Sequence, residues 1–240
     1  MKVTFRLAKL PRNDQREKLF QCRSLLPVYG DTVQSQEEKL LWQERWTKGQ
    51  TGWDQGKAHP GLSLLLEHAR REGGLADKGA FYSAGCGRAH SEAALARAGY
   101  RVRAVDLSYE AISEASKIYG DLPSLELKVE DLFKIDDAER QSYEAIFDRA
   151  MLCALPPEAR EDYIAAMKAR LKDGGPFCAI LFRSLNIDTH PPYPIDETEA
   201  WRLLERDFVL AYAGTLPSVP VPAAIKEEWI CVWRLRGAPV

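Results

Sequence analysis

The sequence contains little that would support a membrane, disulfide or metal-binding role. No unbroken apolar run is longer than the short segment 177–182, whereas a membrane-spanning helix needs about 20 apolar residues. Only five cysteines are present, an odd number at wide spacing and with no CxxC pair. This number and spacing argue against a disulfide scaffold and a zinc module. The four histidines do not fall at metal-ligand spacings, so we expect no metal site.

The sequence also has no large excess of positive or negative charge. The 240 residues include 33 Lys and Arg and 35 Asp and Glu, which gives a formal net charge of −2. Without bulk positive charge, nucleic-acid binding is not expected. Hydrophobic residues make up 45% of the chain, enough for a sizeable core in one domain of ordinary size. Unpaired cysteines suit a reducing compartment, so we expect a cytoplasmic protein. We also expect a monomer, with neither membrane nor nucleic acid among its partners.

The amino terminus has a different composition from the rest. Residues 1–23 contain seven basic residues against two acidic ones. Such an arm fits a solvated extension or an organelle-targeting segment, and its low serine content favours the extension. We therefore divide the chain into an amino-terminal extension, residues 1–36, and a single domain, residues 37–240.

From residue 37 onward, helical and strand patterns alternate. Helices are predicted over 37–48, 59–71, 91–98, 109–119, 156–171 and 197–206, and strands over 80–84, 101–107, 125–129, 144–147, 177–182, 208–213 and 229–235. This alternation predicts a parallel sheet covered by helices on both faces. The last two strands are separated only by a Pro-rich loop, so we expect them to pair as an antiparallel hairpin at one edge.

The strongest local feature is a small-residue segment, 83–89, that contains Gly85, Cys86 and Gly87 between a strand and a helix. Such a loop can simply turn the chain, or it can let a ligand approach the backbone near free N–H donors. Asp106 ends the next strand, 106 − 87 = 19 residues after Gly87. An acid at this spacing binds ribose hydroxyls, or else caps the following helix. The third glycine of a dinucleotide fingerprint is missing, so a single nucleoside-like ligand fits better than NAD.

Two further segments follow strand ends. Asp131 and Leu132 come after the third strand, where an acid beside apolar residues suits an adenine amino group and ring. Asp148 and Arg149 come after the fourth strand, as an ordinary ion pair or as a source of positive charge at a cleft. Ligands of open α/β sheets bind outside the carboxyl ends of the strands. These segments are therefore expected to converge on the glycine loop.

In this order the segments resemble class I S-adenosylmethionine-dependent methyltransferases, and more narrowly the thiopurine S-methyltransferase family with its halide/thiol methyltransferase relatives. The resemblance covers about residues 37 to 236 and is carried by the segments 42–56, 85–89, 105–108, 147–160 and 190–194. It implies a Rossmann-like α/β fold, with a seven-stranded, mostly parallel sheet, an antiparallel terminal strand and helices on both faces.

The resemblance also implies S-adenosyl-L-methionine as cofactor and a small thiol or thiopurine-like methyl acceptor, with no acid or base supplied by the protein. The implied cofactor-binding residues are Trp42, Trp46, Trp53, Gly85, Cys86, Gly87, Asp106, Leu107, Asp131, Leu132 and Arg149. The implied acceptor contacts are Trp53, Arg149, Pro192 and Tyr193, with Arg149 and Asp148 positioning the reactants. The tryptophans also fit a role as core anchors, and Cys86 and Cys153 are expected to pack rather than react.

Two alternatives stay open at this point. A halide, selenium or tellurium methyltransferase belongs to the same class, although the segments 147–150 and 155–157 look more like the thiopurine branch. A cofactor-binding module without catalysis belongs to another class. The intact segments 53–54 and 148–149 argue against that module.

Overall fold

The computed structural model describes residues 36–216 and 222–237. The predicted amino-terminal extension, apart from residue 36, lies outside the described residues, and the division of the chain at residue 36 stays a prediction. The helices are α1 Gln36–Thr47, α2 Leu62–Arg71, α3 His90–Arg97, α4 Tyr109–Tyr119, α5 Met151–Ala154, α6 Arg160–Arg170 and α7 Glu197–Leu204, with 3-10 turns η1 Asp137–Glu139 and η2 Pro157–Ala159. The strands are β1 Ala80–Ala84, β2 Arg101–Asp106, β3 Leu125–Val129, β4 Ala145–Asp148, β5 Pro176–Leu185, β6 Phe208–Thr215 and β7 Ile225–Leu235.

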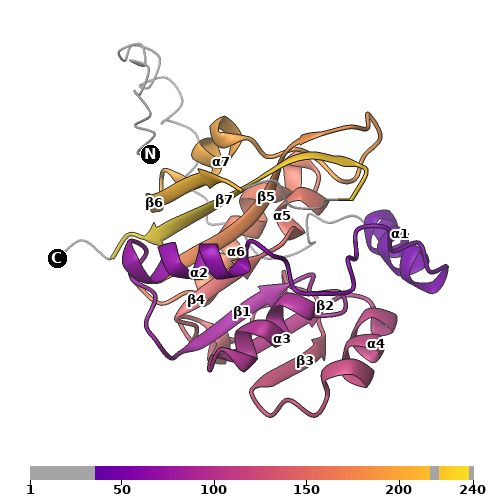
Figure 1. Ribbon diagram of the computed structural model, residues 1–240, viewed down its shortest axis with the longest axis horizontal. Helices are drawn as coiled ribbons and strands as arrows, with labels where there is room; N and C mark the ends of the chain where they lie inside the picture. The colour runs from indigo at the N-terminus through magenta and orange to yellow at the C-terminus, as the bar shows by residue number, and fades with distance from the viewer. Residues whose placement is uncertain (1–35, 217–221, 238–240) are drawn as a thin grey trace. The chain divides into compact units, whose positions relative to one another are not determined.

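The seven strands form one sheet in the order β3-β2-β1-β4-β5-β7-β6 (Figure 1). The pairs from β3 to β5 are parallel, and β7 is antiparallel to both of its neighbours. The predicted mostly parallel sheet and its terminal hairpin are thus confirmed. The strand order reverses between β1 and β4, and ligands of such sheets bind at that reversal, beyond the carboxyl ends of the strands.

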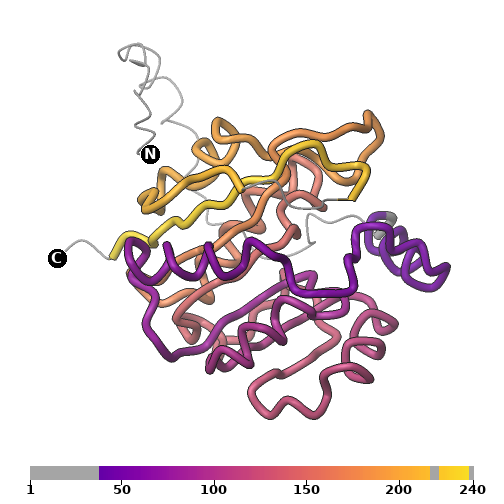
Figure 2. The backbone as a smooth tube through the Cα atoms, viewed as in Figure 1, coloured from indigo at the N-terminus to yellow at the C-terminus, as the bar shows by residue number. Residues whose placement is uncertain are grey.

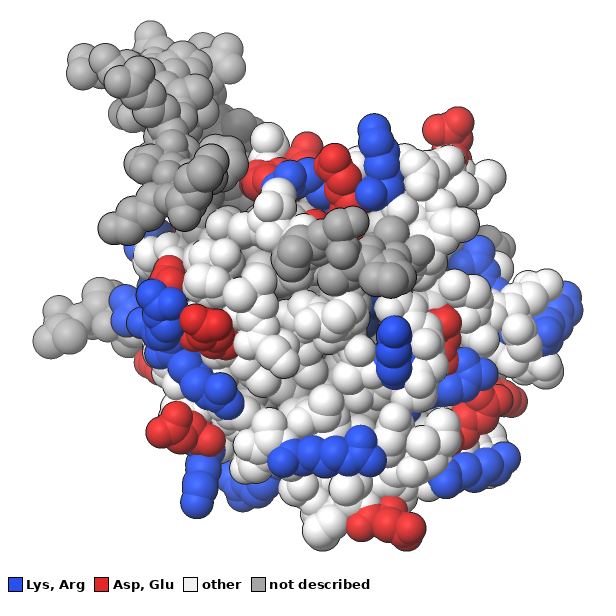
Figure 3. Space-filling view, viewed as in Figure 1, with Lys and Arg blue, Asp and Glu red and all other residues white. Residues whose placement is uncertain are grey.

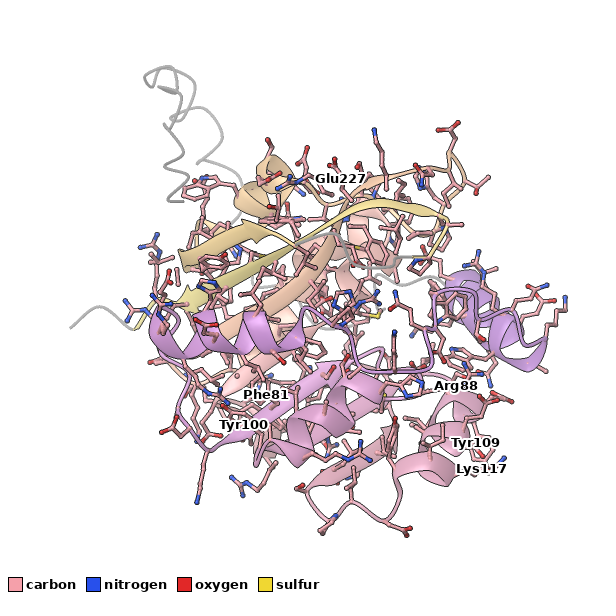
Figure 4. The ribbon with its side chains drawn as sticks, in the orientation of Figure 1. Phe81, Arg88, Tyr100, Tyr109, Lys117 and Glu227 are labelled. Carbon is pink, nitrogen blue, oxygen red and sulfur yellow. The ribbon has the colours of Figure 1, made fainter. Side chains whose placement is uncertain are left out.

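Helices cover both faces of the sheet, and each face has its own apolar core. Along β1, Phe81 packs in the core that includes α2 and α3, while Tyr82 packs in the core that includes α6 and α7. Figure 4 shows Phe81 beside Tyr100, and their ring centroids are 4.9 Å apart. Because β5 lies between two such layers, the continuous apolar run 177–182 is buried throughout.

The chain path brings α1 and α4 together although they are far apart in sequence. The two helices pack against each other, as the tube in Figure 2 shows at the end of the sheet where the glycine loop lies. On the face drawn in Figure 3, acidic and basic side chains are interspersed, as suits a formal net charge of −2. The packing of α1 on α4 places the first tryptophans of the domain over the ends of the parallel strands.

The helix boundaries differ most from the sequence prediction at the start of the second helix and at the start of the helix predicted from Pro156. The second helix begins at Leu62 rather than His59, because residues 59–61 form a turn in which the His59 carbonyl accepts the Leu62 N–H at 3.0 Å. The long helix predicted from Pro156 begins as the 3-10 turn η2 and becomes regular only at Arg160. The short helix α5 before it was not predicted. Part of the Pro-rich loop, residues 217–221, lies outside the described residues.

Candidate active site

The glycine loop after β1 depends on residues without side chains. Gly85 and Gly87 both have left-handed backbone, with φ of +63° and +55°. A Cβ on Gly85 would lie 2.5 Å from the Met151 sulfur, and a Cβ on Gly87 would lie 3.3 Å from the Trp46 ring. Other residues would therefore be strained in backbone and crowded by their neighbours. Glycine here lets α1 and α5 close in on the loop.

Asp106 lies at the end of β2 beside this loop. Its Oδ2 accepts the N–H of Gly87 and its Oδ1 accepts the N–H of Ser108, both at 2.9 Å. Burial raises the pKa of Asp106, while these N–H donors act in the opposite direction. The helix cap is Ser108, whose Oγ accepts the Ala111 N–H at 3.3 Å. The half-buried carboxylate of Asp106 keeps further lone pairs for hydroxyl donors in the cleft.

A cleft of about 410 Å³ opens over the glycine loop and the carboxyl ends of β1 to β4. Most of the predicted site residues line it, namely Trp42, Trp46, Trp53, Gly85, Gly87, Asp106, Leu107, Asp131, Leu132, Arg149 and Pro192. Its other lining residues are mostly apolar and include Ala150, Met151, Ala154, Phe182, Pro191, Ala223, Ala224 and Ile225. The structure therefore brings together segments that are scattered over the whole domain.

Three tryptophans form one wall of the cleft. The ring of Trp53 meets those of Trp42 and Trp46 edge-on, at centroid distances of 5.4 and 5.9 Å. Trp46 is buried, whereas Trp42 and Trp53 are half-buried. The role of core anchor therefore fits Trp46 best, whereas Trp42 and Trp53 present aromatic surface to the cleft. An aromatic face attracts a cation by about 0.5–2 kcal/mol, which suits a sulfonium ligand.

Arg88 holds the tryptophan-bearing loop against the glycine loop. Its guanidinium pairs with Asp54 and with Glu114 on α4, the latter at 2.6 Å. It also lies over the Trp46 ring, 5.1 Å from the centroid. Figure 4 shows Arg88 in this position between α1 and α4. Sequence analysis did not identify Arg88, because its partners come from segments well before and after it.

Asp131 is tied to α1. Its Oδ2 pairs with Lys39 Nζ at 2.8 Å, and its Oδ1 accepts the Phe133 N–H at 3.1 Å. The buried Arg170 donates to the Leu132 carbonyl at 2.8 Å and so supports the same loop from below. Asp131 and Leu132 both line the cleft, and their contact with an adenine stays a prediction. Lys39 and Arg170 are contributions that the local sequence did not reveal.

One of the two interpretations of the sequence was an ion pair between Asp148 and Arg149. The structure describes both residues and does not contain this pair. Arg149 Nη2 instead contacts Glu228 Oε1 at 3.0 Å, and Glu228 Oε2 lies 2.8 Å from His59 Nε2. Because His59 Nδ1 accepts the Gly61 N–H at 3.0 Å, the proton of a neutral His59 lies on Nε2 and is donated to Glu228. Within the described residues, Arg149 Nε is buried and has no hydrogen-bond partner.

Three predicted residues lie outside the lining of the cleft. Asp148 is fully buried and accepts from Tyr163 Oη at 2.8 Å and from the Leu152 N–H at 3.1 Å. Burial raises its pKa to about 6, and its bonds hold α5 in place. Tyr193 donates its N–H to the Cys153 carbonyl at 2.7 Å, which fixes the neighbouring prolines. Cys86 contributes to the adjoining smaller cavity rather than to the cleft.

The cysteines have the inert character that was expected of them. Burial raises the pKa of the Cys86 thiol well above its ordinary value, and it raises that of Cys153 as well. Thiols in this state are poor nucleophiles. Within the described ranges, no group of three His, Cys, Asp or Glu side chains is arranged to hold a metal ion. No helix in the same ranges has the length and apolar character needed to cross a membrane.

The residues of the cleft fit S-adenosylmethionine. Asp106 has carboxylate oxygens of the kind that accept from ribose hydroxyls, and Asp131 and Leu132 place an acid beside an apolar residue. The tryptophan wall offers aromatic faces that attract a cation. The unpartnered Nε of Arg149 leaves a donor for a carboxylate. Fold and cleft together define a class I S-adenosylmethionine-dependent methyltransferase, and comparison with known proteins places it more narrowly.

Residues 37–229 match the thiopurine S-methyltransferase family, and the chain belongs to this family. It is 29% identical over 207 residues to a thiopurine S-methyltransferase of Azotobacter vinelandii, covering 79% of this chain and 89% of that protein. It is also 29% identical over 166 residues to a probable thiol methyltransferase 2 of Arabidopsis thaliana, covering 68% and 70%. The protein is therefore an S-adenosylmethionine-dependent S-methyltransferase.

The fold agrees with solved methyltransferase structures. A Burkholderia thailandensis 1,6-didemethyltoxoflavin-N1-methyltransferase, crystallised with 1,6-didemethyltoxoflavin and S-adenosylhomocysteine, superposes with a TM-score of 0.64 at 22% identity. The match covers 82% of this chain and 87% of that one. The Rossmann-like architecture expected from the sequence is thus confirmed.

Proposed function

We propose that the enzyme transfers a methyl group to the sulfur of a small thiol or thiopurine-like acceptor. The observation that carries this proposal is the composition of the cleft around Arg149. Met151, Phe182 and Pro192 present apolar surface there, and the Arg149 guanidinium lies 5.7 Å from the centroid of the Phe182 ring. An acceptor with a flat apolar ring suits this apolar surface, and its ionised sulfur suits the neighbouring positive charge of Arg149.

The protein has a modest chemical task in this reaction. Bound S-adenosylmethionine supplies an electrophilic methyl group on sulfur and leaves as a neutral thioether, so no protein acid is needed. A thiolate is already a good nucleophile, so no strong base is needed either. The tryptophan wall and the prolines at 191–192 exclude water and hold the acceptor in line. The charge of Arg149 lowers the pKa of a bound thiol.

The residue roles follow from these positions and are part of the proposal. Asp106 binds the ribose, Asp131 and Leu132 bind the adenine, and Trp42, Trp46 and Trp53 surround the sulfonium. Arg149 contacts either the acceptor or the carboxylate of the cofactor. Tyr193 and Asp148 act indirectly, through the backbone segments that they hold. We also propose a cytoplasmic location, which suits the four free cysteines among the described residues. The monomeric state stays a prediction.

The acceptor is tested with methyl-labelled S-adenosylmethionine and a panel of thiophenols, thiopurines, sulfide and iodide. The proposal predicts labelled S-methyl products from the aromatic thiols, with kcat/KM well above the values for sulfide and iodide. Arg149→Ala should reduce kcat/KM for thiols by about 10- to 150-fold, the usual loss of a charge-assisted hydrogen bond. Label that appears only in methyl iodide would support the halide alternative instead.

A further inference from the structure

Glu92 is a buried carboxylate that has no role in the methyl transfer described above. It lies in the first turn of α3 among apolar neighbours, and only 3% of its surface is exposed. Its Oε1 accepts a hydrogen bond from the Ser83 hydroxyl at 2.7 Å. In the part of the chain that the structure describes, no salt bridge reaches Glu92, and Arg149 is the cation whose charge lowers its pKa.

This arrangement is costly for the free protein. Burial raises the pKa of Glu92 to about 7, because a carboxylate without an ion pair is poorly stabilised away from water. The neighbouring residues of α3, such as Ala93 and Leu95, show that the helix packs its buried side with apolar residues. A buried acid at such a position, at the edge of a cleft, is typical of a binding group whose partner arrives with the ligand.

Glu92 faces a smaller cavity of about 80 Å³ that adjoins the cleft. The two cavities share Trp46, Trp53, Gly85, Gly87 and Arg149 in their linings. The smaller cavity thus begins where the glycine loop and the tryptophan wall meet. A ligand with its ribose at Asp106 and its sulfonium at the tryptophans would extend its remaining end toward this space.

The smaller cavity contains charges of both signs. Glu92 offers a carboxylate, and Arg149 offers a guanidinium whose Nε has no partner within the described residues. An α-amino acid group carries an ammonium and a carboxylate on neighbouring atoms, so it is complementary to this pair. We propose that Glu92 binds the α-ammonium group of S-adenosylmethionine and of its demethylated product. This inference concerns the methyl donor and does not depend on the acceptor proposed above.

A purely structural role for Glu92 makes a different prediction. In that case its bond to Ser83 braces β1 below the glycine loop, and a substitution would weaken every ligand of the loop alike. Glu92→Gln separates the two roles, because the amide oxygen still accepts from the Ser83 hydroxyl while the negative charge is lost. Two ligands that differ only in the amino group then show whether Glu92 contacts the α-ammonium group.

The experiment is isothermal titration calorimetry of wild type and Glu92→Gln with two ligands. One ligand is S-adenosylhomocysteine, and the other is its deamino analogue, which keeps the carboxylate and lacks the ammonium. The variant should bind S-adenosylhomocysteine about 10- to 150-fold more weakly, the usual loss of a charge-assisted hydrogen bond. Its Kd for the deamino analogue should stay within twofold of the wild-type value.

Glu67→Gln is the matched control, since it removes the same charge from an exposed position on α2. It should leave both Kd values unchanged. Equal weakening of both ligands by Glu92→Gln would overturn the proposal in favour of loop support, and unchanged binding of both would overturn it as well. A wild-type protein that bound neither ligand would instead contradict the cofactor assignment itself.

Discussion

Half-buried Arg149 and buried Glu228 form an ion pair that joins the loop after β4 to the antiparallel strand β7, with Nη2 and Oε1 3.0 Å apart. The second carboxylate oxygen of Glu228, Oε2, lies 2.8 Å from His59 Nε2. Three segments that are distant in sequence are thereby fixed at one point on the border of the cleft. The direction of the Arg149 guanidinium is set by this pair rather than by its neighbour Asp148.

Breaking this pair should cost stability. Glu228→Ala leaves the guanidinium of Arg149 without its partner, and the free energy of unfolding should fall by about 3 kcal/mol. Adding Arg149→Ala removes the unpaired charge, so the double variant should lose less than the sum of the two single losses. Denaturant unfolding of the four proteins measures this coupling. Losses that simply add would show that the pair contributes nothing as a unit.

Asp106 should determine cofactor affinity. Asp106→Ala should weaken the binding of S-adenosylhomocysteine by about 1–3 kcal/mol, because ribose hydroxyls lose their acceptor. Calorimetry gives the Kd directly. Asp121→Ala provides the control, since it removes the same side chain from an exposed position after α4. Wild-type affinity in Asp106→Ala would refute the ribose role.

Glu92 should make the stability of the cofactor-free protein depend on pH. Its pKa rises from 4.5 to about 7 on folding, so the folded protein binds this proton more tightly than the unfolded chain does. Stability from Glu92 is therefore fully present below pH 4.5 and is lost as the pH rises to about 7. Arg149 and Asp106 supply the other charges that act on Glu92.

The comparison with Glu92→Gln isolates this contribution. The Tm of the variant relative to wild type should increase between pH 4.5 and 7 and then stay level. Asp148, with its pKa raised to about 6 by burial, changes stability in the same direction in both proteins and cancels. A Tm difference that did not vary with pH would mean that Glu92 does not titrate in this range.

Trp53 should matter for turnover more than for folding. Trp53→Ala removes a half-buried ring from the cleft wall, and kcat/KM should fall by about 2- to 30-fold, the range of a lost cation–π contact. The control is Trp201→Ala, which removes a ring that is 42% exposed on α7 and lies outside the lining of the cleft. If activity and Tm fell together in Trp53→Ala, the ring would be a structural support.

Much of this architecture can be predicted from local sequence. Apolar periodicity locates the strands and helices, and the spacing from Gly87 to Asp106 predicts that two strand ends meet. These features are local because each depends on residues within one βαβ unit. The boundary of α2 is harder to predict, since Pro60 suits a helical first turn. The turn before α2 is held in part by the buried contact between His59 and Glu228, which are far apart in sequence.

The parts of the site that sequence analysis missed are contacts between distant segments. His59 and Glu228 are separated by 169 positions, and Lys39 and Asp131 by 92. Neither pairing has a sequence spacing that would reveal it. Glu92 illustrates a second difficulty, because an acid in the first turn of a helix is ordinary. Only its burial shows that this one does more than face solvent.

The most direct test of the account is the pH dependence of kcat/KM for two aromatic thiols of different thiol pKa. If the cleft methylates preformed thiolates without a protein base, kcat/KM should rise with pH and level off near the pKa of each thiol, earlier for the more acidic one. If both thiols instead level off at one shared pH, an ionising group of the enzyme controls the reaction. That result would contradict a mechanism based on positioning alone.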